Sequence, residues 1–211
     1  MKILHVDASP LGSASISRQL TAAVVDHLKK ETPTASVTHR DLIASPVAHL
    51  SGELVQALRP APGSPPAGES IRAEADQTET LLSELLESDV LVIGAPMYNF
   101  SIPSQLKAWI DRVLQPGRTF RYSADGPIGL AAGKKAIVVS SRGGMYAGKP
   151  FETAMDHQEA YLRTVLGFIG ITDIAYVRAE GVGMGPEQKN AALAAANQQI
   201  AALRVEYARA A

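Results

Sequence analysis

Hydrophobic residues gather in five short runs along the chain, and three of these runs are nearly continuous. The runs at 2–8, 90–95 and 135–141 are rich in Val, Ile and Leu, which is typical of strands that are covered on both faces of a parallel sheet. The run at 36–42 alternates between apolar and polar positions and indicates a strand at the edge of the sheet. A fifth strand is expected at 173–181.

Apolar residues spaced by three and four positions predict a helix after each strand. The expected helices cover residues 16–28, 71–86, 102–113, 150–168 and 186–207. Strands and helices that alternate in this way are typical of a parallel sheet with helices on both faces, so we expect a single α/β domain over residues 1–211. The segment at 59–68 holds four prolines and two glycines and is expected to be a surface loop.

Composition narrows the functional classes. Hydrophobic residues make up 46% of the chain and charged residues 19%, which is ordinary for a globular protein. The net charge of −1 offers no basic surface for nucleic acid, and no apolar stretch is long enough to span a membrane. The absence of cysteine excludes disulfides and a cysteine nucleophile and agrees with a reducing compartment. We therefore expect a cytoplasmic protein with neither nucleic-acid nor membrane partners.

The segment after the first expected strand is rich in serine. Ser9, Ser13, Ser15 and Ser17 precede or open the first helix, with no lysine or arginine between residues 8 and 17. Hydroxyl groups and free N–H groups at a helix start can bind an anion, and the G-x-G-x-x-G pattern of dinucleotide sites is missing. This favours a phosphate monoester held by neutral donors. The alternative is helix capping, but a cap needs one serine rather than four.

Two further loops follow the third and fourth expected strands. Residues 97–100, Met-Tyr-Asn-Phe, put aromatic rings on a turn where a flat ligand could stack, although a turn packed under a neighbouring loop is an equally good alternative. Residues 140–144, Ser-Ser-Arg-Gly-Gly, let a main chain pass close to a ligand, although alone they are typical of an ordinary glycine turn. Parallel sheets bind ligands beyond the carboxyl ends of their strands. The three loops together therefore indicate one ligand with a phosphate and a flat ring, such as flavin mononucleotide (FMN).

Other kinds of site find no support in the sequence. The five histidines, at positions 5, 27, 39, 49 and 157, lie far apart and show no metal-ligand spacing, so we expect no metal site. Neither a G-x-S-x-G elbow nor a P-loop occurs. A response-regulator receiver would need an acidic pair after the first strand, whereas Asp7 is followed by Ala8.

Three segments carry a resemblance to a known family: DASPLGSASISRQL, VLVIGAPMYNFSIPSQLKAWIDRVLQPGRTFRY and GKKAIVVSSRGGMY. Through them the chain resembles the bacterial FMN-dependent NADH-azoreductases, relatives of the NAD(P)H:quinone oxidoreductases. The resemblance implies a flavodoxin-like fold, with a doubly wound five-stranded parallel sheet in the order 2-1-3-4-5. It also implies three sets of FMN contacts: Ser9, Ser15, Ile16 and Ser17 at the phosphate, Met97, Tyr98, Asn99 and Phe100 at the isoalloxazine, and Ser141, Arg142, Gly143 and Gly144 at the polar edge of the ring.

The same resemblance implies an activity. NADH or NADPH would pass hydride through FMN to quinones, giving hydroquinones, and to azo compounds, which would be cleaved to aromatic amines. Donor and acceptor would occupy one flavin face in turn, in a homodimer with the flavins at its interface. No catalytic side chain is demanded, and Phe120 and Phe168 are candidates to sandwich the acceptor. The alternative is a flavodoxin-type electron carrier, but carriers are usually strongly acidic and this chain is nearly neutral.

Overall fold

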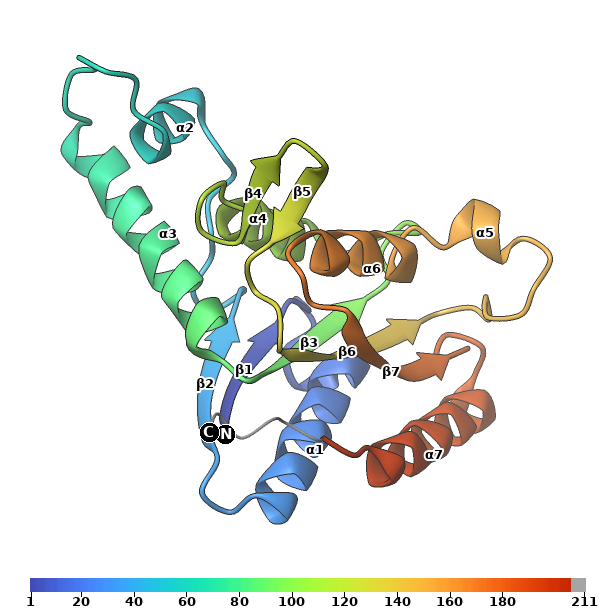
Figure 1. Cartoon of the computed structure of the whole chain (residues 1–211). Helices are drawn as coiled ribbons and strands as arrows, with labels where there is room; N and C mark the ends of the chain where they lie inside the picture. The colour runs from blue at the N-terminus through green and yellow to red at the C-terminus, as the bar shows by residue number, and fades with distance from the viewer. Residues whose placement is uncertain (206–211) are drawn as a thin grey trace.

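A five-stranded sheet runs through the middle of the molecule, with helices on both of its faces (Figure 1). The computed structural model describes residues 1–205. All neighbouring strands of this sheet are parallel, in the order β2-β1-β3-β6-β7, which confirms the predicted order and places the second strand at an edge. The strands are β1 (Lys2–Asp7), β2 (Ser36–Asp41), β3 (Val90–Pro96), β6 (Lys135–Arg142) and β7 (Asp173–Glu180).

Two layers of helices cover the sheet. Helices α1 and α7 lie on one face, where they pack with Ile3 and Val92, and α3, α4 and α6 lie on the other, where they pack with Leu4 and Ile93 (Figure 1). The helices are α1 (Ile16–Glu31), α2 (Gly52–Leu58), α3 (Glu69–Glu87), α4 (Ser104–Val113), α5 (Glu152–Met155), α6 (Glu159–Phe168) and α7 (Pro186–Ala202), with a short 3-10 turn at Gly12–Ala14.

The central position of β3 in the sheet explains why the sequence of this strand is uniformly apolar. All of its seven residues are buried, because β1 and β6 flank it in the sheet and helices cover both faces. Gly94 is needed in this strand, since a Cβ at that position would lie 2.7 Å from the Oδ1 atom of Asp7 on β1. The buried strands thus bring the ends of β1, β3 and β6 to neighbouring positions.

The single helix expected at 150–168 is wrong, because the structure divides it into α5 and α6. Asp156 separates the two helices. Its Oδ1 atom accepts hydrogen bonds from the main-chain N–H groups of Gln158 and Glu159, at 3.0 and 3.1 Å. A short side chain that binds main-chain donors in this way starts a new helix. The break also lets the N–H group of His157 donate to the carbonyl of Phe100 at 3.0 Å.

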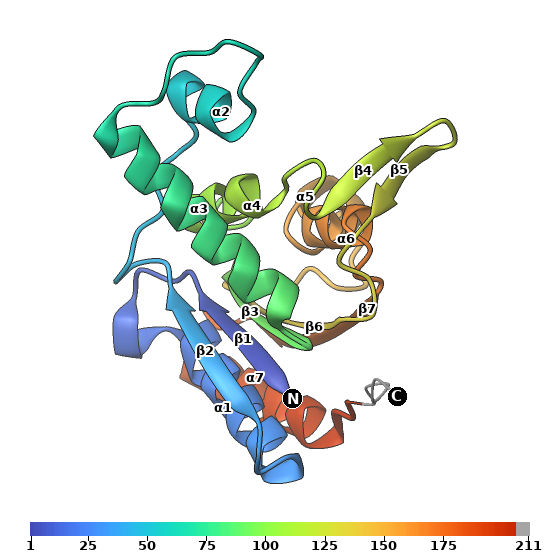
Figure 2. The same ribbon diagram turned by 60° about the vertical axis from the view of Figure 1, so that its left-hand side comes forward.

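A β-hairpin was not predicted from the sequence. Strands β4 (Phe120–Ser123) and β5 (Gly126–Gly129) pair antiparallel apart from the main sheet, and the hairpin projects beside α6 (Figure 2). Gly129 anchors its base, because a Cβ there would lie 2.2 Å from the main-chain nitrogen of Gly170. Strands of four residues are too short for their alternation to be recognised in a sequence.

The remaining differences between prediction and structure are an additional helix and one helix end. Helix α2 was not predicted; its start is capped by Ser51, whose Oγ atom accepts from the N–H group of Leu54 at 3.1 Å. The helix expected at 186–207 ends at Ala202, and Tyr207 lies outside the described residues. The proline-rich segment at 59–68 is a loop between α2 and α3, as predicted. Within residues 1–205, no helix is both long enough and apolar enough to cross a bilayer.

Candidate functional site

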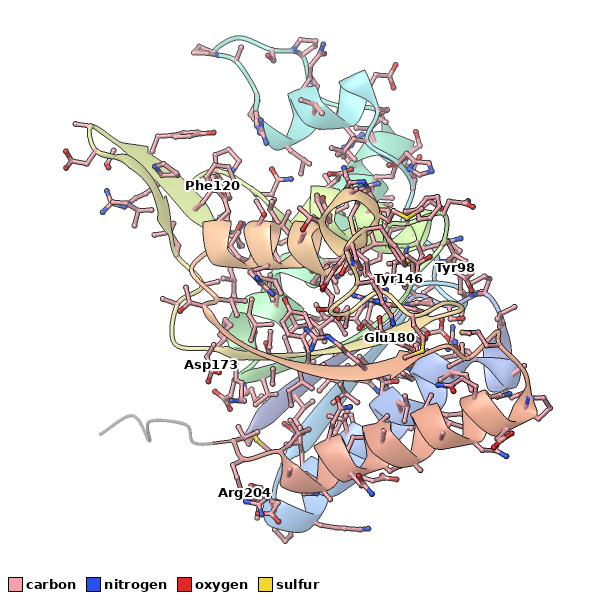
Figure 3. All side chains as sticks on the ribbon, turned by 90° about the vertical axis from the view of Figure 1, so that its right-hand side faces the viewer. Tyr98, Phe120, Tyr146, Asp173, Glu180 and Arg204 are labelled. Atoms are coloured by element: carbon pink, nitrogen blue, oxygen red, sulfur yellow. The ribbon has the colours of Figure 1, made fainter. Side chains whose placement is uncertain are left out.

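The candidate site lies where β1, β3 and β6 end. These strands are neighbours in the sheet, and the carboxyl ends of parallel strands lie at the same edge, where such sheets bind ligands. In Figure 3, Tyr98 from the loop after β3 and Tyr146 from the loop after β6 lie on the same side as Glu180, the last residue of β7. The three loops that the sequence singled out therefore meet at one edge.

The loop after β1 buries three serines. Ser9, Ser15 and Ser17 are 0, 2 and 1% exposed. Ser15 caps α1, since its Oγ atom accepts from the N–H group of Arg18 at 3.3 Å, and it lies 3.0 Å from the Oγ atom of Ser17. Capping therefore accounts for Ser15 but for neither of the other two. Buried hydroxyls next to the unpaired N–H groups of a helix start suit an anion such as a phosphate.

Arg18 lies beside this loop, but its guanidinium is already hydrogen-bonded to other groups of the protein. Its two terminal nitrogens each donate to Asp41 at 2.7 Å, and its Nε atom donates to the carbonyl of Ser9 at 3.0 Å. The hydrogen bonds from Arg18 hold the pKa of Asp41 well below its usual range, so this pair stays charged at neutral pH. The arginine thus ties the serine loop to the end of β2, and an anion at the loop would be bound by neutral donors.

The turn after β3 holds an unusual conformation. Tyr98 and Ser101 exchange main-chain hydrogen bonds of 2.9 and 3.1 Å, and the two residues between them have positive φ angles, 48° at Asn99 and 71° at Phe100. This is the geometry of a type I′ turn, which favours Asn and Gly. A phenylalanine there costs roughly 1–3 kcal/mol, and such strain gathers at functional sites. The ring of Phe100 is also 43% exposed, which suits a side chain that covers a ligand.

The end of β6 is hydrogen-bonded to the first residue of the turn segment. The N–H group of Met97 donates to the carbonyl of Ser141 at 2.8 Å. The main chain of the two glycines that follow is held in turn by the loop after β7: Gly183 donates to the carbonyl of Gly143 at 3.0 Å, and Gly181 to that of Gly144 at 2.9 Å. A Cβ on Gly143 would meet nothing within 4 Å, so open space adjoins this loop.

The side chain of Arg142 faces inward. It is 1% exposed and donates to Gln158, Glu180 and Asp156 at 2.9, 2.9 and 2.8 Å. If Arg142 contacts a ligand, the contact is therefore made by its main-chain atoms. Glu180 also accepts from the N–H group of Tyr146 at 3.1 Å, so the network fixes the loop after β6. The sequence offered no signal for these acidic partners, because they lie on other elements at no regular spacing.

A hollow of about 600 Å³ adjoins the turn. It lies between the serine loop, the turn and the start of α4, and its lining includes Pro10, Tyr98, Ile102 and Tyr161. The hydroxyl of Tyr98 is buried and has no hydrogen-bond partner among the described residues. The hollow thus combines apolar side chains with polar ones, among them Gln105 and Lys107 at the start of α4, as ligand sites commonly do.

Phe120 and Phe168 are not brought to this site within one chain. Their ring centroids lie 4.6 Å apart, on β4 and at the end of α6. Figure 3 shows Phe120 on the far side of the molecule from Tyr98. The proposed role of these two rings in holding an acceptor stays a prediction, since in a single chain they do not reach the candidate site.

Two of the histidines that are far apart in the sequence, His5 and His39, are brought together by the fold. Their rings stack with centroids 4.4 Å apart, because β1 and β2 pair in a register that puts the two residues side by side. Asp7 lies next to both. Burial raises the pKa of Asp7, but the nearby His5 and the hydrogen bonds from Thr21 and His39 outweigh it and hold the pKa below its usual value. The predicted strand order could have revealed this pairing, since it already placed the two strands next to each other.

Known proteins are similar to this chain over nearly its whole length, including all residues of the candidate site. A family described by its flavodoxin-like fold matches residues 1–203. The chain is 55% identical over 210 residues to the FMN-dependent NADH:quinone oxidoreductase of Azospirillum brasilense, covering 99% of this chain and 100% of that relative. It is 55% identical to the protein of the same name from Ralstonia nicotianae, covering 96 and 100%. The crystal structure of an azoreductase from Bacillus anthracis matches with a TM-score of 0.87 at 26% identity, covering 96 and 97%.

Proposed function

This chain belongs to the flavodoxin-like family of FMN-dependent NADH:quinone oxidoreductases, and we propose from that membership that it binds FMN and reduces quinones and azo compounds with NADH. The observation that carries the proposal is the meeting of the buried serine loop and the left-handed turn at neighbouring strand ends. One loop suits a phosphate and the other a flat ring, and FMN has both.

The residues of the chain fit this cofactor. Ser9 and Ser17 have buried hydroxyls next to the start of α1, and the buried hydroxyl of Tyr98 has no hydrogen-bond partner among the described residues. Open space beside Gly143 would accept a ring edge. Bound FMN supplies the two-electron chemistry that links NADH to a quinone or an azo compound.

Each part of the chain has a task in this proposal. Ser9, Ser15, Ser17 and the N–H groups at the start of α1, including that of Ile16, would bind the phosphate. Tyr98 and Phe100 would wall the ring and exclude water from it, and the main chain at residues 141–144 would meet its polar edge. Arg142 acts indirectly, because its buried ion pairs hold that main chain in place.

A flavodoxin-type carrier has less support. The chain is 55% identical to proteins named as oxidoreductases, and its net charge of −1 is far from the strongly acidic surface of a carrier. The two functions differ in one simple property: an oxidoreductase accepts electrons from NADH directly, whereas a carrier needs a partner reductase.

Steady-state kinetics should give a ping-pong pattern. If NADH and the acceptor occupy the same face of the site in turn, varying NADH at several fixed quinone concentrations gives parallel double-reciprocal lines. With an azo dye, about two NADH should be oxidised for each bond cleaved, because each round delivers two electrons. The measurement is NADH absorbance during turnover of the FMN-loaded protein.

Converging lines would show that both substrates bind together and would remove the shared site. A flavin that NADH and NADPH both fail to bleach would remove the oxidoreductase assignment and leave the carrier. Release of the cofactor by heat and its chromatography should give FMN; FAD, or no flavin, would contradict the cofactor.

A homodimer is part of the same proposal. The ring of Phe100 is 43% exposed and the hollow beside the turn is open, while Phe120 lies on the far side of the same chain (Figure 3). A second copy would close the open side of the site. Light scattering should therefore give about twice the chain mass of 22.3 kDa. A monomer with full turnover would contradict a shared site.

We also propose a cytoplasmic location, because the electron donor NADH belongs to that compartment. Cell fractionation should recover the NADH-dependent quinone reductase activity with cytoplasmic marker enzymes. Activity that follows the membrane or a secreted fraction would overturn this location.

A further inference from the structure

Three potential metal ligands meet on β1 and β2. His5 and Asp7 point to the same face of β1, since they are two residues apart in a strand, and His39 lies opposite His5 on β2. The Oδ2 atom of Asp7 lies 3.2 Å from the Nε2 atom of His5 and 3.1 Å from that of His39. One ligand atom from each residue lies within 4.8 Å of the other two. The fold thus gathers two imidazoles and a carboxylate that are distant in the sequence.

The imidazole of His5 is unusual within this group. The residue is 7% exposed, and its Nε2 atom has no hydrogen-bond partner among the described residues. The atom faces the oxygen of Asp7 but is not aligned with it for a hydrogen bond. Buried polar atoms nearly always have a partner, so a buried imidazole nitrogen that lies 3.2 Å from a carboxylate oxygen without bonding to it is open to a shared ligand beside both atoms.

The surroundings prepare Asp7 to bind a cation. Thr21 donates to its Oδ1 atom at 2.9 Å, which orients the carboxylate as outer hydrogen bonds do in metal sites. The nearest positive group is Arg18, 3.8 Å from Oδ2, but this guanidinium is bound to both oxygens of Asp41. The charge of the arginine is therefore matched elsewhere, and the remaining side-chain bond to Oδ2 comes from His39 at 3.1 Å, which a bound ion would replace.

We propose that His5, Asp7 and His39 form a binding site for a divalent transition-metal ion of the zinc type. The ligands would be the two Nε2 atoms and the Oδ2 atom. Bonds of about 2.0–2.1 Å in a tetrahedral arrangement put neighbouring ligand atoms about 3.3 Å apart, close to the 3.1 and 3.2 Å separations found here. Two imidazoles favour zinc, cobalt, nickel or copper over magnesium and calcium.

An ion can reach this site from solvent. The side chain of His39 is 48% exposed, while those of His5 and Asp7 are 9 and 4% exposed. The fourth position of a tetrahedral ion would therefore be on the outer side, open to water. The ligands belong to the strands rather than to the three loops of the candidate FMN site, so metal binding can be measured with FMN in place.

Zinc titration of the FMN-loaded protein tests the proposal. After treatment with a chelator, calorimetry should show one Zn²⁺ bound per chain. His39→Gln should weaken binding by at least about tenfold, because even the loss of an outer hydrogen bond to a ligand typically costs 10–100-fold. His49→Gln is the matched control, since His49 is exposed and outside the group, and it should bind as tightly as the wild type.

A second variant gives a spectroscopic readout. The chain has no cysteine, so His39→Cys would introduce a single thiolate, which is itself a metal ligand. Co²⁺ should then produce a thiolate-to-metal absorption band in the difference spectrum against Zn²⁺, and His49→Cys should not. The proposal is overturned if the wild type binds no zinc at one per chain, if His39→Gln binds zinc unchanged, or if the band is absent from His39→Cys.

Discussion

Replacing Ser15 and Ser17 together by alanine should weaken FMN binding by about two to four orders of magnitude. Both residues are buried at the start of α1, and with FMN bound each hydroxyl would donate to the phosphate in place of the 3.0 Å bond that joins the two hydroxyls here. A hydrogen bond to a charged group contributes about 1.5–3 kcal/mol, and each 1.4 kcal/mol corresponds to a factor of about ten in affinity. Titration of the apoprotein with FMN, followed by flavin fluorescence, gives the dissociation constant.

Two controls separate the cofactor from the helix. Ser15 caps α1, so its loss also costs about 1 kcal/mol of stability. Ser51→Ala removes an equivalent cap from α2 and should leave FMN affinity unchanged, as should Ser13→Ala at an exposed serine of the same loop. Equal FMN affinity in the double variant and the wild type would reduce Ser15 and Ser17 to capping and packing roles.

Arg142→Met should lower the free energy of unfolding by about 3–5 kcal/mol, the usual cost of breaking a buried ion pair from one side. The guanidinium is fully enclosed and lies 2.8–2.9 Å from carboxylate oxygens of Asp156, Glu159 and Glu180. Methionine fills a similar volume but leaves these carboxylates without their cation. Within residues 1–205, only Glu159 keeps a second cationic partner, Arg178. Urea unfolding of the apoprotein measures the loss without a contribution from bound flavin.

A surface pair provides the comparison. Arg118 makes two 2.6 Å hydrogen bonds to Glu79, but both side chains are about half exposed, and such pairs are worth about 0–1 kcal/mol. Arg118→Met should therefore change stability little. Adding Glu180→Gln to Arg142→Met should restore part of the loss, because it removes one unpaired charge. Equal effects of Arg142→Met and Arg118→Met would show that burial does not set the strength of the Arg142 network.

The sheet was predictable because burial leaves a simple trace in a sequence. A strand such as β3, with neighbours on both sides and helices on both faces, can hold little but apolar residues. The meeting of the three loops was predictable for a related reason: the carboxyl ends of parallel strands lie at one edge of the sheet, where ligand contacts are expected. Serine-rich and aromatic loops at those places could therefore be read as parts of one site.

What escaped prediction depends on contacts between distant parts of the chain. Asp156 breaks a helical pattern by binding main-chain N–H groups, and an aspartate in an apolar repeat looks the same whether it caps or faces solvent. The partners of Arg142 come from α6 and β7 at no fixed spacing. The pairing of His5 with His39 depends on strand register, which becomes known only once both strands are aligned.

The position of β1 also determines when a nascent chain can acquire its cofactor. β1 is synthesised first, yet it lies between β2 and β3, and its pairing with β3 starts only at Val90. Until then the strand that leads into the serine loop has a free edge, and Gly144 is reached only after roughly two thirds of the chain has been made. At about 5–20 residues per second, the ribosome needs roughly 7–30 s to reach Gly144, and until then the three loops proposed to hold FMN are not all present. Under the proposed function, FMN is therefore bound only late in synthesis, and a chain that is truncated before β6 lacks one of the three loops proposed to bind it.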